Sequence, residues 1–313
     1  MATTQHLARK VPGPHIRLVL FDAFDTLARP RKPPHVQYAD EARAHGLRWG
    51  TSSSASHREE EENEAIGRAF KQAFKQTLAQ HPRYGLTTGL PNPAAWWSLL
   101  IERTFQPLLP PSQPIPPALT PALLTRFASN KAYDLFDDVH PALSALRENG
   151  LALGLATNSD AAIVQALSQL GLERHMNLSL LPPSPSLSPS GDESSRSPPP
   201  PTLSYTAPAD KPDAAFFAYA LARAQIHTPQ EVLYVGDQLH EDYWGAKDAG
   251  LRALWLRRRR PQDGSVMVSN QPVSRGANKV GRDERGAEQG EEVRTLIEVV
   301  EYISRVNAEA ASG

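Results

Sequence analysis

The chain has 313 residues and a formal net charge of −1 at pH 7, and 40% of its residues are hydrophobic. This length fits one large or two modest domains with a buried core, and so small a net charge gives no field that would attract a nucleic acid or a membrane surface. The chain contains no cysteine, which excludes disulfides, thiolate zinc sites and a cysteine nucleophile and suits an intracellular protein.

Two basic segments bear on localisation. Residues 1–17 carry basic residues and no acidic ones, as a transit peptide does, but Pro12, Gly13 and Pro14 would interrupt an amphipathic helix. No stretch approaches the roughly 20 apolar residues that a membrane-spanning helix needs. We therefore expect a cytoplasmic protein with no membrane partner. The basic run at 257–260 could serve as a nuclear signal, although a solvated strand end is the simpler interpretation.

The first predicted strand ends on a carboxylate. Residues 18–21 form an apolar run, and Asp22 and a polar turn follow it directly. Such a run is typical of a buried strand in a parallel sheet, and open α/β sheets bind ligands at the carboxyl ends of their strands. Asp22 is therefore a candidate nucleophile or metal ligand. The competing interpretation is a turn aspartate, because Asp is common in turns.

A long helical region follows this strand. The pattern predicts a helix over 35–45 that ends at Gly46, and Ser56 with Glu59 forms a capping-box signature for a second helix. Apolar residues recur every four positions in that second helix, which indicates packing against neighbouring helices. Further helices are expected over 94–105 and 120–131.

Two later segments could bind a phosphate. The apolar strand over 151–156 runs into Thr157 and Asn158, where a hydroxyl and backbone N–H groups are available. Lys211 directly precedes a predicted helix that opens with Pro212, a favoured residue in the first turn. Its ammonium group would offset the charge of carboxylates and phosphate, although a solvated surface lysine is the competing interpretation.

A second strand of the same kind as the first lies far downstream. Residues 232–236 are apolar and end on Asp237, and Asp242 follows. If the two strands are neighbours, Asp22, Asp237 and Asp242 come together, and clustered carboxylates repel one another unless a proton or a cation compensates. Oxygen-only ligands favour Mg²⁺.

Two segments are predicted to be disordered surface loops inserted between elements of the core. Residues 182–209 are rich in Pro and Ser, and residues 261–290 are polar and Gly-rich, so neither can bury enough apolar surface to offset the entropy of ordering. The first could bind an SH3 or WW module, although a dispensable loop is the simpler interpretation. A final helix is expected over 293–306.

Taken in order, these segments resemble the four motifs of the haloacid dehalogenase-like (HAD) hydrolase superfamily. The motifs are carried by Asp22 with Thr26, by Thr157 with Asn158, by Lys211, and by Asp237 with Asp242. Within the superfamily, the strings at 42–47 and 84–87 and the pair Trp96 and Trp97 resemble the group named haloacid dehalogenase-like hydrolase domain-containing protein 3.

The resemblance implies an α/β fold, with a doubly wound (Rossmann-like) parallel sheet and an inserted all-helical cap domain. The core would comprise residues 15–31 and 134–313, and the cap residues 32–133. A cap that closes over the site would exclude water and select the substrate.

The resemblance also implies a reaction with a small phosphorylated molecule. Asp22 would attack phosphorus to give an aspartyl-phosphate, which water then hydrolyses. Thr157 and Lys211 would hold the phosphoryl group, and Thr26 and Asn158 would contribute to substrate binding. Mg²⁺ would be bound by one set of ligands: Asp22, the backbone carbonyl of Phe24, Asp237 and Asp242.

One position departs from the phosphatase pattern. The second aspartate of the first motif, a general acid and base, is replaced by Phe24, and Asp25 follows where the family usually has Gly. Asp25 could substitute for the missing acid or could simply cap its own turn. A catalytically weak relative that binds a metabolite or a protein remains an alternative, as does a metal-independent dehalogenase. The pair Asp237 and Asp242 favours phosphate chemistry over dehalogenation, because a metal-free enzyme has no evident use for the added negative charge.

Overall fold

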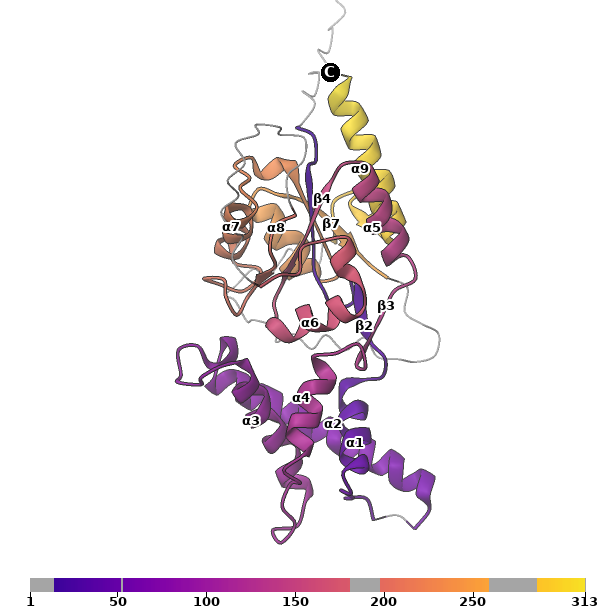
Figure 1. Ribbon diagram of the computed structural model, residues 1–313, viewed down its shortest axis with the longest axis vertical. Helices are drawn as coiled ribbons and strands as arrows, with labels where there is room; N and C mark the ends of the chain where they lie inside the picture. Colours follow the sequence, from indigo (N-terminus) through magenta and orange to yellow (C-terminus); the bar gives the residue numbers. More distant parts are fainter. Residues whose placement is uncertain (1–13, 52, 181–197, 259–285, 313) are drawn as a thin grey trace, which may run out of the picture.

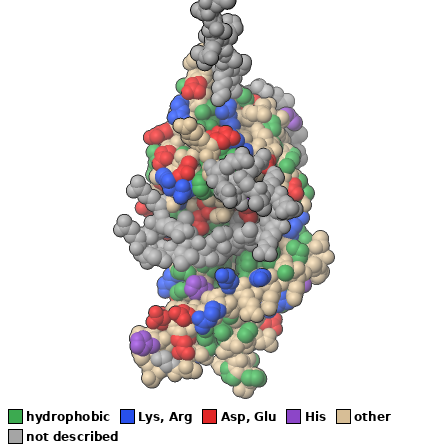
Figure 2. Space-filling view, turned by 180° about the vertical axis from the view of Figure 1, so that it is seen from behind, with side chains coloured by type: hydrophobic (Ala, Val, Ile, Leu, Met, Phe, Trp, Pro, Cys, Tyr) green, Lys and Arg blue, Asp and Glu red, His purple; other side chains and the backbone are tan. Residues whose placement is uncertain are grey.

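The computed structural model describes residues 14–51, 53–180, 198–258 and 286–312 (Figure 1). Most of the two segments predicted as insertions, and two arginines of the basic run, lie outside these residues. The described chain forms an α/β core with a helical cap at one end (Figure 1). On the face seen in Figure 2, acidic and basic side chains are interspersed, in keeping with the small net charge. No described helix combines the length and the apolar character needed to cross a membrane.

The core is built on a six-stranded sheet with the order β5-β4-β1-β6-β7-β8. Its strands are β1 (Leu18–Phe21), β4 (Ala152–Thr157), β5 (Thr202–Leu203), β6 (Val232–Gly236), β7 (Arg252–Leu256) and β8 (Glu292–Val293). Neighbouring strands are parallel, and β1 lies between β4 and β6, with Leu18 opposite both Ala152 and Val232. The predicted α/β fold with a parallel sheet is confirmed.

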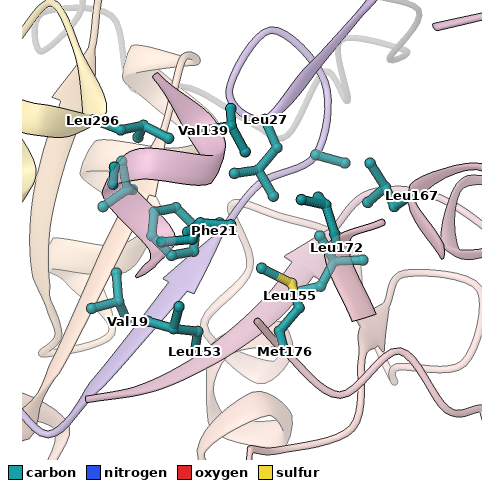
Figure 3. Packing of buried hydrophobic residues seen from close by; sticks show 14 of the residues in the cluster. Val19, Phe21, Leu27, Val139, Leu153, Leu155, Leu167, Leu172, Met176 and Leu296 are labelled. Carbon is teal, nitrogen blue, oxygen red and sulfur yellow. The ribbon is translucent and has the colours of Figure 1, made fainter. Parts of the chain in front are cut away.

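Both faces of the sheet are covered by helices, because successive side chains of a strand point to opposite faces. Val19 and Phe21 pack with α5 (Val139–Glu148), α6 (Ala161–Gln169) and α9 (Leu296–Ala311) (Figure 3). Leu18 and Leu20 pack on the other face with α7 (Ala214–Arg223) and α8 (Gly245–Asp248). Polar side chains at the strand ends are therefore the groups of the sheet that remain for chemistry.

The cap has its own apolar core. Its α-helices are α1 (Pro34–Ala44), α2 (Ala55–Gln80), α3 (Pro93–Phe105) and α4 (Leu119–Phe127). They pack around Tyr38, Ile66, Trp96, Leu100 and Phe105. Two antiparallel strands, β2 (Ala28–Pro30) and β3 (Tyr133–Leu135), connect the cap to the core. The predicted helical insertion after the first strand is thus confirmed.

Two helix starts differ from the prediction. The capping box expected at Ser56 and Glu59 does not form, because α2 begins earlier, at Ala55, and its N-cap residue makes no side-chain cap hydrogen bond. The helix expected to open with Pro212 begins two residues later. There the Asp213 side chain accepts a hydrogen bond from the backbone N–H of Ala215 (2.8 Å) and so sets the helix start.

The first predicted insertion is too long at its C-terminal end. Residues 198–209 are described, and Thr202 and Leu203 form the edge strand β5, which pairs in parallel with β4. The side chain of Leu203 is 1% exposed in the main core. The Pro-rich composition of the surrounding segment conceals this short strand, and an edge strand tolerates neighbouring prolines because it pairs on one side only.

The second predicted insertion is also too long. Residues 286–290 are described, and Glu288 accepts a hydrogen bond from the Lys247 ammonium group (3.1 Å). The final helix, expected over 293–306, begins at Leu296, because Val293 belongs to the edge strand β8.

Candidate active site

The candidate site lies at the carboxyl ends of the central strands. Asp22 directly follows β1, and its backbone N–H donates a hydrogen bond to the carbonyl oxygen of Val235 in β6 (3.0 Å). Its side chain is 1% exposed. Thr157 ends β4 on one side, and Asp237 follows β6 on the other. The sheet therefore brings the three predicted residues together at the carboxyl ends of its central strands.

Asp22, Asp237 and Asp242 form a carboxylate cluster, in which one oxygen from each lies within 4.8 Å of the others. Asp242 lies in a π-helical turn (Leu239–Trp244), and its Oδ2 accepts a hydrogen bond from the N–H of Gln238 (2.9 Å). Gly236 makes room for it, since a Cβ at that position would lie 2.2 Å from Asp242 Oδ2.

Burial and mutual repulsion disfavour the charged forms of this cluster. Burial, followed by the charges of Asp242 and Asp22, raises the pKa of Asp237 well above its usual range. Burial also raises the pKa of Asp242, against the opposing effect of the Lys211 ammonium group. Such a site requires nearby positive charge to keep its acids ionised.

Lys211 supplies part of that charge from the centre of the cluster. Its side chain is 0% exposed, and its Nζ donates hydrogen bonds to Asp22 Oδ1 (2.7 Å), Asp242 Oδ1 (2.6 Å) and the hydroxyl of Tyr234 (2.9 Å). Burial alone would lower the pKa of Lys211, but Asp22 and Asp242 raise it well above its usual range. The Tyr234 hydroxyl in turn donates to the carbonyl oxygen of Ala156 (2.6 Å). Lys211 is therefore a fixed cation in contact with two of the three acids.

Asn158 holds the backbone of Lys211, and Glu241 in turn hydrogen-bonds to Asn158. Asn158 Oδ1 accepts from the N–H of Lys211 (2.8 Å), and its Nδ2 donates to the carbonyl oxygen of Lys211 (3.1 Å) and to Glu241 Oε2 (3.2 Å). Burial raises the pKa of Glu241 to about 7. Asn158 was predicted to contribute to substrate binding, which stays a prediction; in the structure its amide hydrogen-bonds to the backbone of Lys211 and to Glu241.

Two buried hydroxyl groups in the segments that carry the site have no hydrogen-bond partner among the described residues. They are Thr157 Oγ1, at the end of β4, and Thr26 Oγ1, in the loop after Asp22. Buried polar groups in proteins are almost always hydrogen-bonded, so such orphans call for a ligand or water. The carbonyl oxygen of Thr26 is held separately, by Arg258 Nε (3.1 Å) and a terminal nitrogen of the same guanidinium (2.7 Å).

The position of the missing acid is filled by an aromatic ring. Phe24 packs against Tyr133 at a ring-centroid distance of 5.7 Å. Its phenyl group carries no ionisable proton. Asp25 follows with a left-handed backbone (φ 52°) and is 3% exposed. Its Oδ1 has no hydrogen-bond partner among the described residues, and burial, followed by the charge of Asp22, raises its pKa to about 6. Asp25 is thus a buried acid that titrates near neutral pH.

The cap is tied to the loops that carry the site. Arg83 donates hydrogen bonds to the carbonyl oxygen of Ser204 (2.9 Å) and to Asp210 Oδ1 (3.2 Å), in the loop that leads to α7. Trp97 Nε1 donates to Asp160 Oδ2 (2.7 Å) at the start of α6. The cap therefore lies closed over the carboxyl ends of the strands.

Sequence reasoning missed Tyr234 and Glu241. Tyr234 lies in a strand whose other residues are apolar, and that contrast was a usable signal. Glu241 directly precedes Asp242, but nothing in the sequence links it to Asn158.

Comparisons with known proteins agree with this geometry. The family model described as haloacid dehalogenase-like hydrolase matches residues 16–250. The chain is 31% identical over 255 residues to haloacid dehalogenase-like hydrolase domain-containing protein 3 of Bos taurus, covering 81% of this chain and 87% of that protein. It is also 30% identical over 202 residues to a phosphoserine phosphatase of Thermus thermophilus, covering 64% and 69% of the two chains.

Among solved structures, the fold is similar to that of YfnB from Bacillus subtilis, which was determined with magnesium bound. The TM-score is 0.55 at 14% identity, covering 93% of this chain and all of the other (100%). The likeness at this identity concerns the fold. From the family match, the relatives and the ordered carboxylate site, we conclude that the chain belongs to the haloacid dehalogenase-like hydrolase family.

Proposed function

We propose that this protein is a Mg²⁺-dependent phosphate-monoester hydrolase that acts through an aspartyl-phosphate intermediate. The observation that carries the proposal is the buried contact of Lys211 with Asp22 and Asp242 beside Asp237. A buried carboxylate at the end of a central strand, next to a fixed cation, suits nucleophilic attack on an anionic substrate. One relative, from Thermus thermophilus, is named a phosphoserine phosphatase, and a phosphatase hydrolyses phosphate monoesters.

The residues present fit a magnesium ion. Three carboxylates with oxygens within 4.8 Å of one another offer an all-oxygen donor set, which is the kind that Mg²⁺ prefers. Asp22, Asp237, Asp242 and the carbonyl of Phe24 would hold it. A bound Mg²⁺ would neutralise charge on the phosphoryl oxygens and on the acids.

The chain's own residues account for the covalent steps. A carboxylate oxygen of Asp22 forms a bond to phosphorus as the bond from phosphorus to the leaving oxygen breaks, and the leaving oxygen takes a proton. Water then attacks phosphorus, which releases inorganic phosphate and regenerates the carboxylate. The Lys211 ammonium group lies against the attacking carboxylate of Asp22 and offsets negative charge there, and the hydroxyl of Thr157, which has no hydrogen-bond partner among the described residues, is available to donate to a phosphoryl oxygen.

Phe24 sets the character of this activity. General acid–base catalysis typically contributes about 10² to 10⁴ in rate, and the phenyl ring cannot supply it. Proton delivery to the leaving oxygen then falls to Asp25 or to water. We therefore expect activated phosphate esters to be hydrolysed much faster than simple alkyl esters.

The replacement of the general acid by Phe24 also supports a second candidate, a non-catalytic relative that binds a phosphorylated metabolite. The two differ in turnover and not in ligand. Release of inorganic phosphate from an aryl phosphate, with Mg²⁺ and with chelator, separates them. We expect turnover that chelator abolishes, with Asp22→Asn as the blank and Asp213→Asn, an exposed helix cap outside the carboxylate cluster, as the matched control. Saturable binding of inorganic phosphate without turnover would support the binding protein, and halide release from a haloacid without a metal would support a dehalogenase.

A further inference from the structure

A cavity of about 70 Å³ lies between the cap and the core, beside the candidate active site. Helices α1 to α4 each contribute side chains to it, among them Tyr38, Phe70 and Ile101. The core contributes Phe24 and residues at the start of α6. The cavity is therefore formed only when the cap is closed on the sheet.

The lining is mainly apolar and aromatic, and its polar groups other than Asp160 are neutral: the hydroxyls of Tyr38, Tyr84, Tyr133 and Ser159 and the amide of Asn158. Among the described residues that line the cavity there is no Lys, Arg or His. The one carboxylate, Asp160, has both oxygens engaged, since Oδ1 accepts from the N–H of Ala162 (2.7 Å) and Oδ2 accepts from Trp97 Nε1 (2.7 Å). A charged group placed here would lose its hydration without a partner of opposite charge.

The cavity adjoins the residues of the candidate active site. Phe24, two residues after Asp22, forms part of its wall, and so does Asn158, whose amide holds Lys211. A group attached to a phosphate on Asp22 and Lys211 would extend along these two residues. The cavity lies where the leaving group of a phosphate ester belongs.

Its size limits the ligand. A cavity of about 150 Å³ accommodates benzene, so a space of about 70 Å³ suits roughly half that bulk, a chain of a few carbon atoms. Larger leaving groups require the cap to open or the side chains to rotate.

We propose that this cavity is the leaving-group subsite and that it selects phosphate monoesters of small, uncharged alcohols over those that carry a charged group, such as amino acids. The inference rests on the proposed function, because it takes the phosphoryl group to be bound by Asp22 and Lys211. It adds a substrate class that differs from the zwitterionic substrate in the name of the Thermus relative.

Calorimetric binding of non-hydrolysable phosphonates tests the subsite independently of turnover. Two probes share a three-carbon chain: propylphosphonate and 2-amino-3-phosphonopropionate. Methylphosphonate and inorganic phosphate serve as references, all with Mg²⁺. Each buried CH₂ is worth roughly fourfold in affinity, so propylphosphonate, with two more such groups, should bind about fifteenfold tighter than methylphosphonate. It should also bind at least about tenfold tighter than 2-amino-3-phosphonopropionate, whose charged groups would be left without partners of opposite charge.

A pair of neighbouring variants locates the effect. Ala162 lines the cavity and Ala161 does not, and both lie half-buried in the first turn of α6. Ala162→Leu should fill the space and reduce the affinity ratio of propylphosphonate to inorganic phosphate to near one. Ala161→Leu should leave that ratio unchanged.

The outcomes separate the two proposals. Equal or tighter binding of 2-amino-3-phosphonopropionate, or an unchanged ratio in Ala162→Leu, would overturn the subsite while leaving the phosphatase intact. The expected preference in a protein that turns over neither an aryl phosphate nor propyl phosphate would support the subsite and overturn the catalytic proposal.

Discussion

Replacing Lys211 with methionine tests the electrostatic arrangement at the centre of the site. The ammonium group is fully buried and donates hydrogen bonds to Asp22, Asp242 and Tyr234 at 2.6–2.9 Å. Methionine keeps much of the volume but leaves two buried carboxylates without their cation. Removing one partner of a buried ion pair typically costs about 3–5 kcal/mol. We expect the free energy of unfolding to fall by this amount near neutral pH, a large part of the stability of an ordinary domain.

The loss should depend on pH, and its sign follows from the carboxylates. Lys211 lowers the pKa of Asp242, so without the lysine that pKa should rise further in the folded state. An acid with a raised folded-state pKa binds more protons when folded than when unfolded, so stability is full below its unfolded pKa and is lost as the pH rises through the folded pKa. The difference between variant and wild type should therefore be larger at about pH 8 than at about pH 5.

Urea unfolding with chelator present, at both pH values, measures the effect. Lys247→Met is a matched control, because that lysine pairs with Glu288 and Glu291 in a more exposed setting and should cost no more than about 1 kcal/mol. Adding Asp242→Asn to the Lys211 variant should restore part of the stability by removing one uncompensated charge. A loss below about 1 kcal/mol, or one that is independent of pH, would refute the reasoning.

Three further predictions follow from other parts of the structure. Millimolar Mg²⁺ should raise the thermal midpoint, because a ligand that binds only the folded state stabilises it, and Asp237→Asn should cancel the shift in scanning calorimetry; an equal shift in that variant would exclude the site at Asp237. Phe24→Asp should raise hydrolysis of alkyl phosphates by part of a factor of about 10² to 10⁴, and initial rates showing no gain would mean that a proton donor is already present. Leu203→Ala should lower the free energy of urea unfolding by about 2–5 kcal/mol, because the leucine is buried in the main core, whereas a neutral result would return β5 to a dispensable loop.

The fold and the cluster of acids could be predicted because their signals are local. Asp22 and Asp237 each follow an uninterrupted apolar run, and parallel strands that are buried on both faces produce such runs. Once β1 and β6 are neighbours, the two carboxylates must lie together at the carboxyl edge. The helical cap was likewise visible in the spacing of apolar residues such as Ile66 and Phe70.

The remaining features depend on contacts between distant segments. Strand β5 has only two residues and follows a Pro-rich stretch, so the composition of that stretch outweighed the signal of Thr202 and Leu203. The hydrogen bonds of Asn158 with Lys211 and Glu241 join residues 53 and 83 positions apart, and no local pattern specifies them. The closed cavity likewise depends on cap and core together, so it could not be foreseen from either part.

The central claim is that the Asp22 carboxylate attacks phosphorus, and trapping the intermediate tests it most directly. The protein is mixed with an activated phosphate ester and Mg²⁺, quenched in acid during the first turnover, and mapped by peptide mass spectrometry. The account predicts one phosphoryl group on the peptide that contains Asp22, and none in Asp22→Asn. Steady release of phosphate with no such adduct, persisting in the Asp22→Asn protein, would contradict it.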